Sequence, residues 1–189
     1  MSVVGETLRE TAIINLTGAV TMVVDDSPFA AELTSSALLG FGIKTRYSMR
    51  SAAEAIEVLR ETEIDLLVVD CEMPGMDGFE LVHWLRRSGP PNAFVPVIMT
   101  AAHIRRSMID KVRNCGANYI VTKPFSAASL LERIVWVARD NRPFLEVGDY
   151  FGPDRRFRQS EPPGAERRAD MQRRAEFEAQ KAAAAETAK

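Results

Sequence analysis

The stretch that most constrains the fold of this chain is the apolar run ending at Asp70, together with the turn-rich segment after it. Leu66–Val69 are all apolar, and Ile64 lies just before them, which predicts a strand buried on both faces. Residues 71–78, with the sequence CEMPGMDG, follow at once and contain a Pro-Gly turn. In an open parallel sheet, ligands bind outside the carboxyl ends of the strands, where a charged residue is more often functional than structural. We therefore expect Asp70 to carry part of this protein's chemistry.

Similar apolar segments recur along the chain and alternate with segments that have helical patterns and caps. Pro28 suits the first turn of a helix, and the run Ser88-Gly89-Pro90-Pro91 is typical of a helix end. The expected strands cover residues 20–24, 43–47, 64–70, 95–100 and 118–121, and the expected helices cover residues 27–39, 51–60, 79–87, 104–114 and 126–139. This strict alternation with short connections predicts an α/β fold, a doubly wound five-stranded parallel sheet with helices on both faces.

Composition divides the chain into four parts. Residues 1–18 form an N-terminal extension and residues 19–140 the α/β domain. Residues 141–163 are expected to be a linker that carries arginine and aromatic side chains. Residues 164–189 are charged and rich in alanine, so we expect a partly helical segment or one that is disordered until a partner orders it.

The overall composition argues against several classes of protein. A net charge of −2 gives no general attraction to nucleic acid, so we expect no DNA partner. The two cysteines are too few for a disulfide framework or a metal-binding cluster. No apolar run approaches the roughly 18 residues of a membrane span, and Glu6, Arg9 and Glu10 interrupt any signal-peptide core. We expect a soluble, cytoplasmic protein.

Polar side chains follow four of the five predicted strands at one edge of the sheet. They are Asp25, Asp26, Asp70, Thr100 and Lys123. Three carboxylates in one place repel unless a cation lies among them, and an all-oxygen ligand set suits Mg²⁺. A hydroxyl and an ammonium opposite that metal would surround the oxygens of a phosphoryl group. The chain has no Walker-type glycine-rich loop, which argues against a nucleotide hydrolase.

These residues, with Met73–Gly78 behind Asp70 and with Lys123-Pro124-Phe125, resemble the receiver domain of bacterial two-component response regulators, which has a CheY-like fold. The resemblance covers about residues 20–139. It implies a signalling switch rather than a metabolic enzyme, in which a histidine kinase or phosphotransfer protein donates a phosphoryl group from phosphohistidine to a carboxylate. Carried over by position, the phosphoacceptor is Asp70, the Mg²⁺ ligands are Asp26, Asp25 (through water), Asp70 and the backbone carbonyl of Glu72, and the residues that contact the phosphoryl oxygens are Thr100 and Lys123.

One position departs from the family pattern. Receiver domains commonly have an aromatic residue three positions before the lysine, and it turns inward when the threonine moves toward the phosphate. Here Ile120 occupies that position, and strand alternation predicts that Tyr119 faces the other side of the sheet. We therefore expect the output surface, formed by helix 104–114, strand 118–121 and helix 126–139, to be controlled in another way.

The arginine-rich segment after the domain is the second informative feature. Guanidinium groups interleaved with aromatic rings can bind phosphates, guanine edges or acidic protein surfaces, although a solvated linker is an equally good interpretation. The segment is similar to the arginine-rich C-terminal extension of CheY-like proteins that bind cyclic di-GMP. The candidate nucleotide-binding or partner-binding residues are Arg105, Arg106, Tyr150, Phe151, Asp154, Arg155, Arg156, Phe157 and Arg158.

Three hypotheses follow from these features. The first is a single-domain response regulator that binds a downstream partner protein when Asp70 is phosphorylated in the presence of Mg²⁺. The second is a cyclic di-GMP effector, in which the arginine-rich segment and helix 104–114 bind the dinucleotide and thereby control binding to a partner such as the flagellar motor. In the third, residues 164–189 form a helix that serves only for docking or dimerisation.

Overall fold

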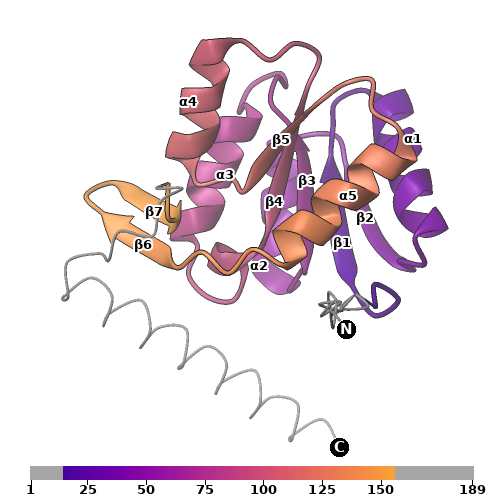
Figure 1. Ribbon diagram of the computed structural model, residues 1–189, viewed down its shortest axis with the longest axis horizontal. Coiled ribbons are helices and arrows are strands. Elements are labelled where there is room, and N and C mark those ends of the chain that lie inside the picture. The colour runs from indigo at the N-terminus through magenta and orange to yellow at the C-terminus, as the bar shows by residue number, and fades with distance from the viewer. Residues whose placement is uncertain (1–14, 156–189) are drawn as a thin grey trace, which may run out of the picture.

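The five apolar segments form one parallel sheet with the strand order β2-β1-β3-β4-β5 (Figure 1). The computed structural model describes residues 15–155, so the expectations for residues 1–14 and 156–189 lie outside the described residues. The strands are β1 Val20–Val24, β2 Thr45–Met49, β3 Leu66–Asp70, β4 Val97–Ala101 and β5 Tyr119–Thr122. The helices are α1 Pro28–Gly40, α2 Ala52–Glu61, α3 Gly78–Arg87, α4 Arg106–Cys115, α5 Ala127–Ala138 and the short 3₁₀ helix η1 Asn92–Phe94. The predicted doubly wound α/β fold is confirmed.

Alternation along the central strand β3 divides the apolar core between the two faces of the sheet. Leu67 and Val69 pack with residues of α2, α3 and α4, whereas Leu66 and Val68 pack with residues of α1 and α5. All five residues of β3 are buried, as expected for a central parallel strand. The sheet is therefore covered on both sides, and polar side chains reach solvent mainly where the strands end.

Local sequence determines where the helices begin. Ser27, Ser51 and Ser126 cap α1, α2 and α5 with their hydroxyl oxygens, and Asp77 and Glu80 form a reciprocal capping box at the start of α3. Four of the five predicted strands begin one or two residues later than expected, including the one predicted at 64–70, which begins at residue 66, and the one predicted at 118–121, which begins at residue 119. The strand predicted at 43–47 begins at residue 45, and the one predicted at 95–100 begins at residue 97 because η1 precedes it.

Residues expected to be a linker instead form an antiparallel hairpin, β6 Phe144–Val147 and β7 Tyr150–Pro153. Gly148 and Asp149 form its two-residue turn, and Gly148 has a φ of 58°, which glycine adopts without strain. The hairpin packs beside α3, η1 and α4 through Phe94, Phe144 and Phe151, whose ring centroids lie 5.2 to 5.6 Å apart. The packed domain therefore continues to at least the end of β7.

A buried arginine of α3 connects the segments on which the hairpin packs. The guanidinium of Arg86 donates hydrogen bonds to the carbonyls of Gly116 (2.9 Å), Ala93 (2.8 Å) and Val95 (2.7 Å), and to the side-chain oxygen of Asn118 (3.2 Å). It also lies 5.1 Å from the centre of the Phe144 ring. Burial lowers the pKa of Arg86 to about 10, so the side chain stays cationic at neutral pH.

Candidate phosphoryl-acceptor site

The polar residues at the strand ends meet at one edge of the sheet, because parallel strands bring their carboxyl ends together. Asp70 is the last residue of β3 and pairs in register with Thr100 of β4. Asp25 follows β1 directly, and its backbone N–H donates to the carbonyl of Met49 at the end of β2. Lys123 follows β5, and its backbone N–H donates to the carbonyl of Ala101. The backbone ladder thus positions each of these side chains.

A single ammonium bridges two of the carboxylates. The Nζ of Lys123 lies 2.6 Å from Oδ2 of Asp25 and 3.0 Å from Oδ2 of Asp70. Carboxylate oxygens of Asp25, Asp26 and Asp70 all lie within 4.8 Å of one another. The side chains of Asp25 and Asp70 are only 4% and 12% exposed, so solvent screens their mutual repulsion weakly. The cluster therefore has three carboxylates, two of which share the ammonium of Lys123.

The electrostatics of the site reflect this shortage of positive charge. Burial raises the pKa of Asp70 above its usual value, and the nearby charge of Asp25 raises it further, while Lys123 opposes both effects. For Lys123, burial alone would lower the pKa, but the hydrogen bonds to Asp25 and Asp70 outweigh it and raise the pKa. Lys123 is therefore cationic at neutral pH, and the cluster still carries more negative than positive charge.

The donor set of this cluster fits Mg²⁺. It consists of carboxylate oxygens, which are hard ligands of the kind that Mg²⁺ prefers, and few of them are needed because the ion keeps several waters. The structure brings together the three carboxylates that were predicted as ligands, Asp25, Asp26 and Asp70. Glu72, whose backbone carbonyl was predicted as a further ligand, lies in the loop that leaves Asp70.

That loop folds back closely on the end of β3. The backbone N–H of Cys71 donates to the carbonyl of Thr100 (2.8 Å), and the backbone N–H of Gly78 donates to the carbonyl of Cys71 (3.2 Å). A Cβ atom on Gly78 would lie 2.0 Å from the carbonyl oxygen of Asp70, so only glycine fits there. The Met73–Gly78 turn thus fixes the path of the backbone beside the carboxylates. Cys71 is fully buried, and burial raises the pKa of its thiol to about 12, so it is no nucleophile at neutral pH.

A cavity of about 590 Å³ adjoins the acidic cluster between this loop and the start of α4. Asp26, Glu72 and Asp77 line one part of it, while Arg105 and Lys111 line another. Arg105 is one of the predicted nucleotide-binding or partner-binding residues, whereas Lys111 is not. The β4–α4 connection brings both residues close to the carboxylates. No local sequence pattern predicts this proximity.

The two residues at the expected switch position lie on opposite faces of the sheet, as predicted. Ile120 packs against the core formed with α2, α3 and α4. Tyr119 packs on the other side, where its ring centre lies 5.3 Å from that of Trp136 and 5.0 Å from the guanidinium of Arg133. An inward rotation of an aromatic ring at position 120 is therefore not available to this chain.

The candidate nucleotide-binding residues do not form one cluster within residues 15–155. Arg105 and Arg106 lie at the start of α4, whereas the guanidinium of Arg155 donates to Asn114 in its last turn (2.5 Å). Ten helical residues span about 15 Å, so the two groups lie at opposite ends of the helix. Arg156, Phe157 and Arg158 lie outside the described residues, and the binding of cyclic di-GMP stays a prediction.

The other described members of that set fold the end of β7 onto the domain. Tyr150 is buried and donates its hydroxyl proton to the carbonyl of Pro153 (2.5 Å), while the guanidinium of Arg155 lies 3.9 Å from the centre of the Tyr150 ring. Phe151 belongs to the aromatic cluster of the hairpin, and Asp154 is 8% exposed, with its backbone N–H bonded to the carbonyl of Pro143. Tyr150, Phe151 and Asp154 therefore have structural roles in this conformation.

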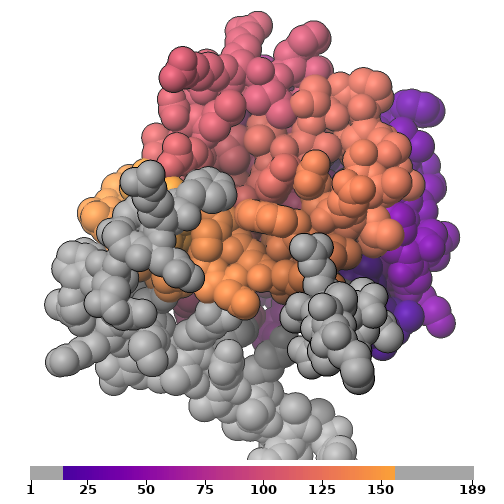
Figure 2. All heavy atoms as spheres, viewed as in Figure 1, coloured from indigo at the N-terminus to yellow at the C-terminus, as the bar shows by residue number. Residues whose placement is uncertain are grey.

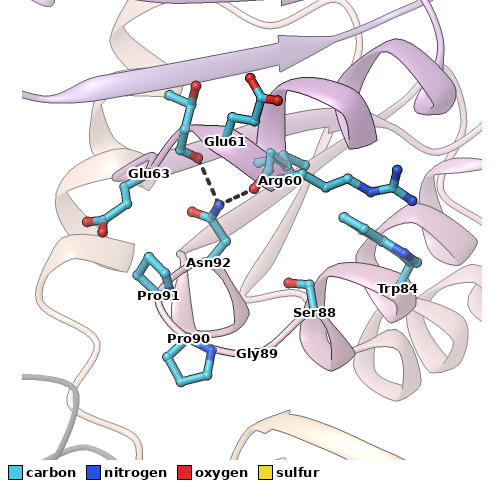
Figure 3. A pocket seen from close by; sticks show the side chains of 11 residues that line it. Arg60, Glu61, Glu63, Trp84, Ser88, Gly89, Pro90, Pro91 and Asn92 are labelled. Carbon is cyan, nitrogen blue, oxygen red and sulfur yellow. Dashed lines mark hydrogen bonds between the residues drawn. The ribbon is translucent and has the colours of Figure 1, made fainter. Parts of the chain in front are cut away.

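A hollow lies between α2 and α3 (Figure 3). Glu63, which lines it, comes just before β3, whereas Asp70 is the last residue of that strand. The side-chain amide of Asn92 donates there to the carbonyls of Leu59 (2.7 Å) and Thr62 (2.8 Å), and its oxygen accepts from the N–H of Ile64 (3.2 Å). These bonds join the end of α2 to the turn after α3. The side-chain amide of Asn92 therefore stabilises the fold through these hydrogen bonds.

Comparison with known proteins agrees with this geometry. The model of the response regulator receiver domain matches residues 21–135, which is more than half of the chain. The fold and the carboxylate cluster define a receiver-type signalling domain. The chain belongs to the response regulator receiver-domain family.

Individual relatives are 26% to 37% identical to this chain over the aligned residues. Chemotaxis protein CheY-3 of Vibrio cholerae is 28% identical over 113 residues, which cover 60% of this chain and 86% of that protein. The heme response regulator HssR of Staphylococcus aureus is 37% identical over 120 residues, covering 62% of this chain but only 50% of that protein. The solved structure of Vibrio cholerae CheY4 is 26% identical, with a TM-score of 0.60, and covers 63% of this chain and 98% of that one.

Within residues 15–155, no helix combines the length and the apolar character that crossing a membrane requires.

Proposed function

We propose that Asp70 accepts a phosphoryl group from a phosphohistidine of a histidine kinase or phosphotransfer protein, and that the phosphorylated form binds a downstream partner. The observation that carries this proposal is the cluster itself, in which Asp25 and Asp70 share the ammonium of Lys123 and the carboxylate of Asp26 lies beside them. A structural ion pair needs one carboxylate for one ammonium. The two additional carboxylates make the cluster costly for folding and suit it to a divalent cation.

The reaction forms one bond and breaks one. A carboxylate oxygen of Asp70 attacks phosphorus, the bond from phosphorus to the imidazole nitrogen of the donor breaks, and the imidazole takes up a proton. The product is an acyl phosphate, which water later hydrolyses to aspartate and inorganic phosphate. When bound, Mg²⁺ would neutralise charge on the phosphoryl oxygens, and Asp25, Asp26, Asp70 and the carbonyl of Glu72 would hold it. Lys123 would pair with another phosphoryl oxygen.

The same residues suggest how phosphorylation changes the surface. Lys123 now bonds to Asp25 and Asp70, and a phosphoryl group on Asp70 would draw its ammonium to the new oxygens. Thr100, on the neighbouring strand, would be drawn toward the same oxygens and would shift the connection from β4 to α4. We place the output surface on α4, β5 and α5, whose atoms adjoin on one face of the molecule (Figure 2). Ile109 and Trp136 are exposed on α4 and α5, at 43% and 37%.

A thermal-shift experiment with a phosphoryl mimic tests this proposal. Beryllofluoride with Mg²⁺ should raise the melting temperature of the full chain, because it binds only the folded state. The shift should be lost in Asp70→Asn and kept in Asp65→Asn. Asp65 is a suitable control because it is a carboxylate at the other end of the same segment, where it accepts a hydrogen bond from the backbone of Val20. A shift that survives Asp70→Asn would exclude Asp70 as the acceptor.

A further inference from the structure

A surface groove of about 590 Å³ lies between α3 and α4, and it shares Phe79 and Lys111 with the cavity beside the carboxylate cluster. Its apolar lining comes mainly from Phe79 and Trp84, which are only partly buried. Lys111 borders it with its Nζ 5.5 Å from the centre of the Phe79 ring, and Asn114 borders it in the last turn of α4. The groove therefore offers two aromatic side chains to an apolar group.

The hairpin contacts the end of this groove that lies at the last turn of α3. Asp149 in its turn forms an ion pair with Arg87, and its Oδ2 lies 3.7 Å from Nε2 of His83; both partners lie on α3 and line the groove. The other end of the hairpin lies against α4. The hairpin thus runs across the base of both helices, from its turn beside α3 to its last residues beside α4.

The described part of the chain ends at the rim of the groove. The guanidinium of Arg113 donates to the backbone carbonyl of Arg155 (3.0 Å), and the guanidinium of Arg155 donates to Asn114 (2.5 Å). Asn114 is itself a lining residue. Two bonds to consecutive residues of α4 and the ring of Tyr150 therefore hold Arg155 in place, and the chain continues from this point.

We propose that the segment beginning at Arg156 docks into the groove of its own chain, with Phe157 inserted between α3 and α4. Phe157 follows Arg155 by two residues, so its Cα lies within about 7 Å of the anchored Cα of Arg155. A tether this short gives an effective concentration of millimolar order or above, so docking of this segment needs far less affinity than binding of a separate molecule at ordinary concentrations. A second copy or another protein has no such advantage.

The experiment uses Trp84 as the reporter in the full chain. The chain has two tryptophans, so Trp136→Phe leaves Trp84 as the only one, and acrylamide quenching then measures its exposure. Phe157→Ala should increase the quenching of Trp84. Phe177→Ala is the matched control, because it removes the same ring from the same segment farther from the anchor, and it should leave quenching unchanged.

Two further results decide between occupants. A peptide of residues 156–163 should restore protection when added to the Phe157→Ala chain, and the same peptide with alanine at position 157 should not. Protection in the parent chain should not change on dilution, because the contact is intramolecular. Equal quenching in the parent and in Phe157→Ala, or protection that falls on dilution and so indicates a second copy, would overturn the proposal. None of these measurements depends on phosphorylation of Asp70.

Discussion

Replacing Arg86 by methionine should destabilise the domain severely. Among the described side chains, only Arg86 joins α3 to both the segment before β4 and the end of α4, through hydrogen bonds to the carbonyls of Ala93, Val95 and Gly116. Methionine has similar length and no donor. The substitution therefore removes the hydrogen bonds while it largely keeps the packing.

The magnitude follows from the three carbonyls. Each bond is 2.7 to 2.9 Å long and has a charged donor, and a buried carbonyl that loses its partner costs about 1–3 kcal/mol. Three such losses would total about 3–9 kcal/mol, but burying a guanidinium without a carboxylate partner is itself costly, and methionine avoids that cost. We expect a net loss of about 3–5 kcal/mol in the free energy of unfolding, which is a large part of the roughly 5–15 kcal/mol of an ordinary domain.

Urea unfolding followed by circular dichroism measures this loss directly. Arg87→Met is the matched control, since Arg87 is the next residue and its ion pair with Asp149 is exposed, so the control should cost no more than about 1 kcal/mol. If Arg86→Met and Arg87→Met lowered the free energy of unfolding equally, the hydrogen bonds of Arg86 would not stabilise the domain as proposed.

Three other outcomes follow from the site. Asp26→Asn should weaken Mg²⁺ binding, measured by calorimetry, because it removes one of the three converging carboxylates; unchanged affinity would place the metal elsewhere. Gly78→Ala should lower the melting temperature, because a Cβ at this position meets the carbonyl of Asp70. Gly18→Ala is the control and should not lower it, because a Cβ there meets no atom within 4 Å. Equal changes in the two melting temperatures would contradict this expectation. Without Mg²⁺, Asp70→Asn should be more stable than the parent at pH 7. Because burial raises the pKa of Asp70 in the folded state above 3.8, the carboxyl favours folding most at pH values below 3.8, and this contribution is lost as the pH rises through the raised pKa. The stability advantage of Asp70→Asn should therefore shrink as the pH falls through that range, and a pH-independent difference would disagree with the raised pKa.

The fold and the carboxylate cluster could be predicted because both depend on local pattern and one general rule. Each strand appears as an apolar run, and parallel strands must bring their carboxyl ends to one edge, so Asp25, Asp70 and Lys123 had to meet. The opposite orientations of Tyr119 and Ile120 follow from strand alternation alone.

The hairpin could not be predicted in the same way. Its contacts are made by aromatic rings, by close glycines and by Arg86, which in sequence looks like an ordinary basic residue near the end of a helix. Gly152 illustrates the difficulty, since a Cβ there would lie 2.7 Å from the Cα of Gly116 in a distant part of the sequence. The separation of Arg105 from Arg155 likewise depends on where the hairpin lies along α4.

Locating the phosphoryl group by peptide mass spectrometry tests the central claim most directly. The full chain is incubated with acetyl phosphate and Mg²⁺, digested at low pH, and mapped. The account predicts one added phosphoryl group, on the peptide that contains Asp70, with none added when Mg²⁺ is chelated or in Asp70→Asn. A phosphoryl group on another residue, or labelling of Asp70→Asn to the same extent as the parent, would contradict it.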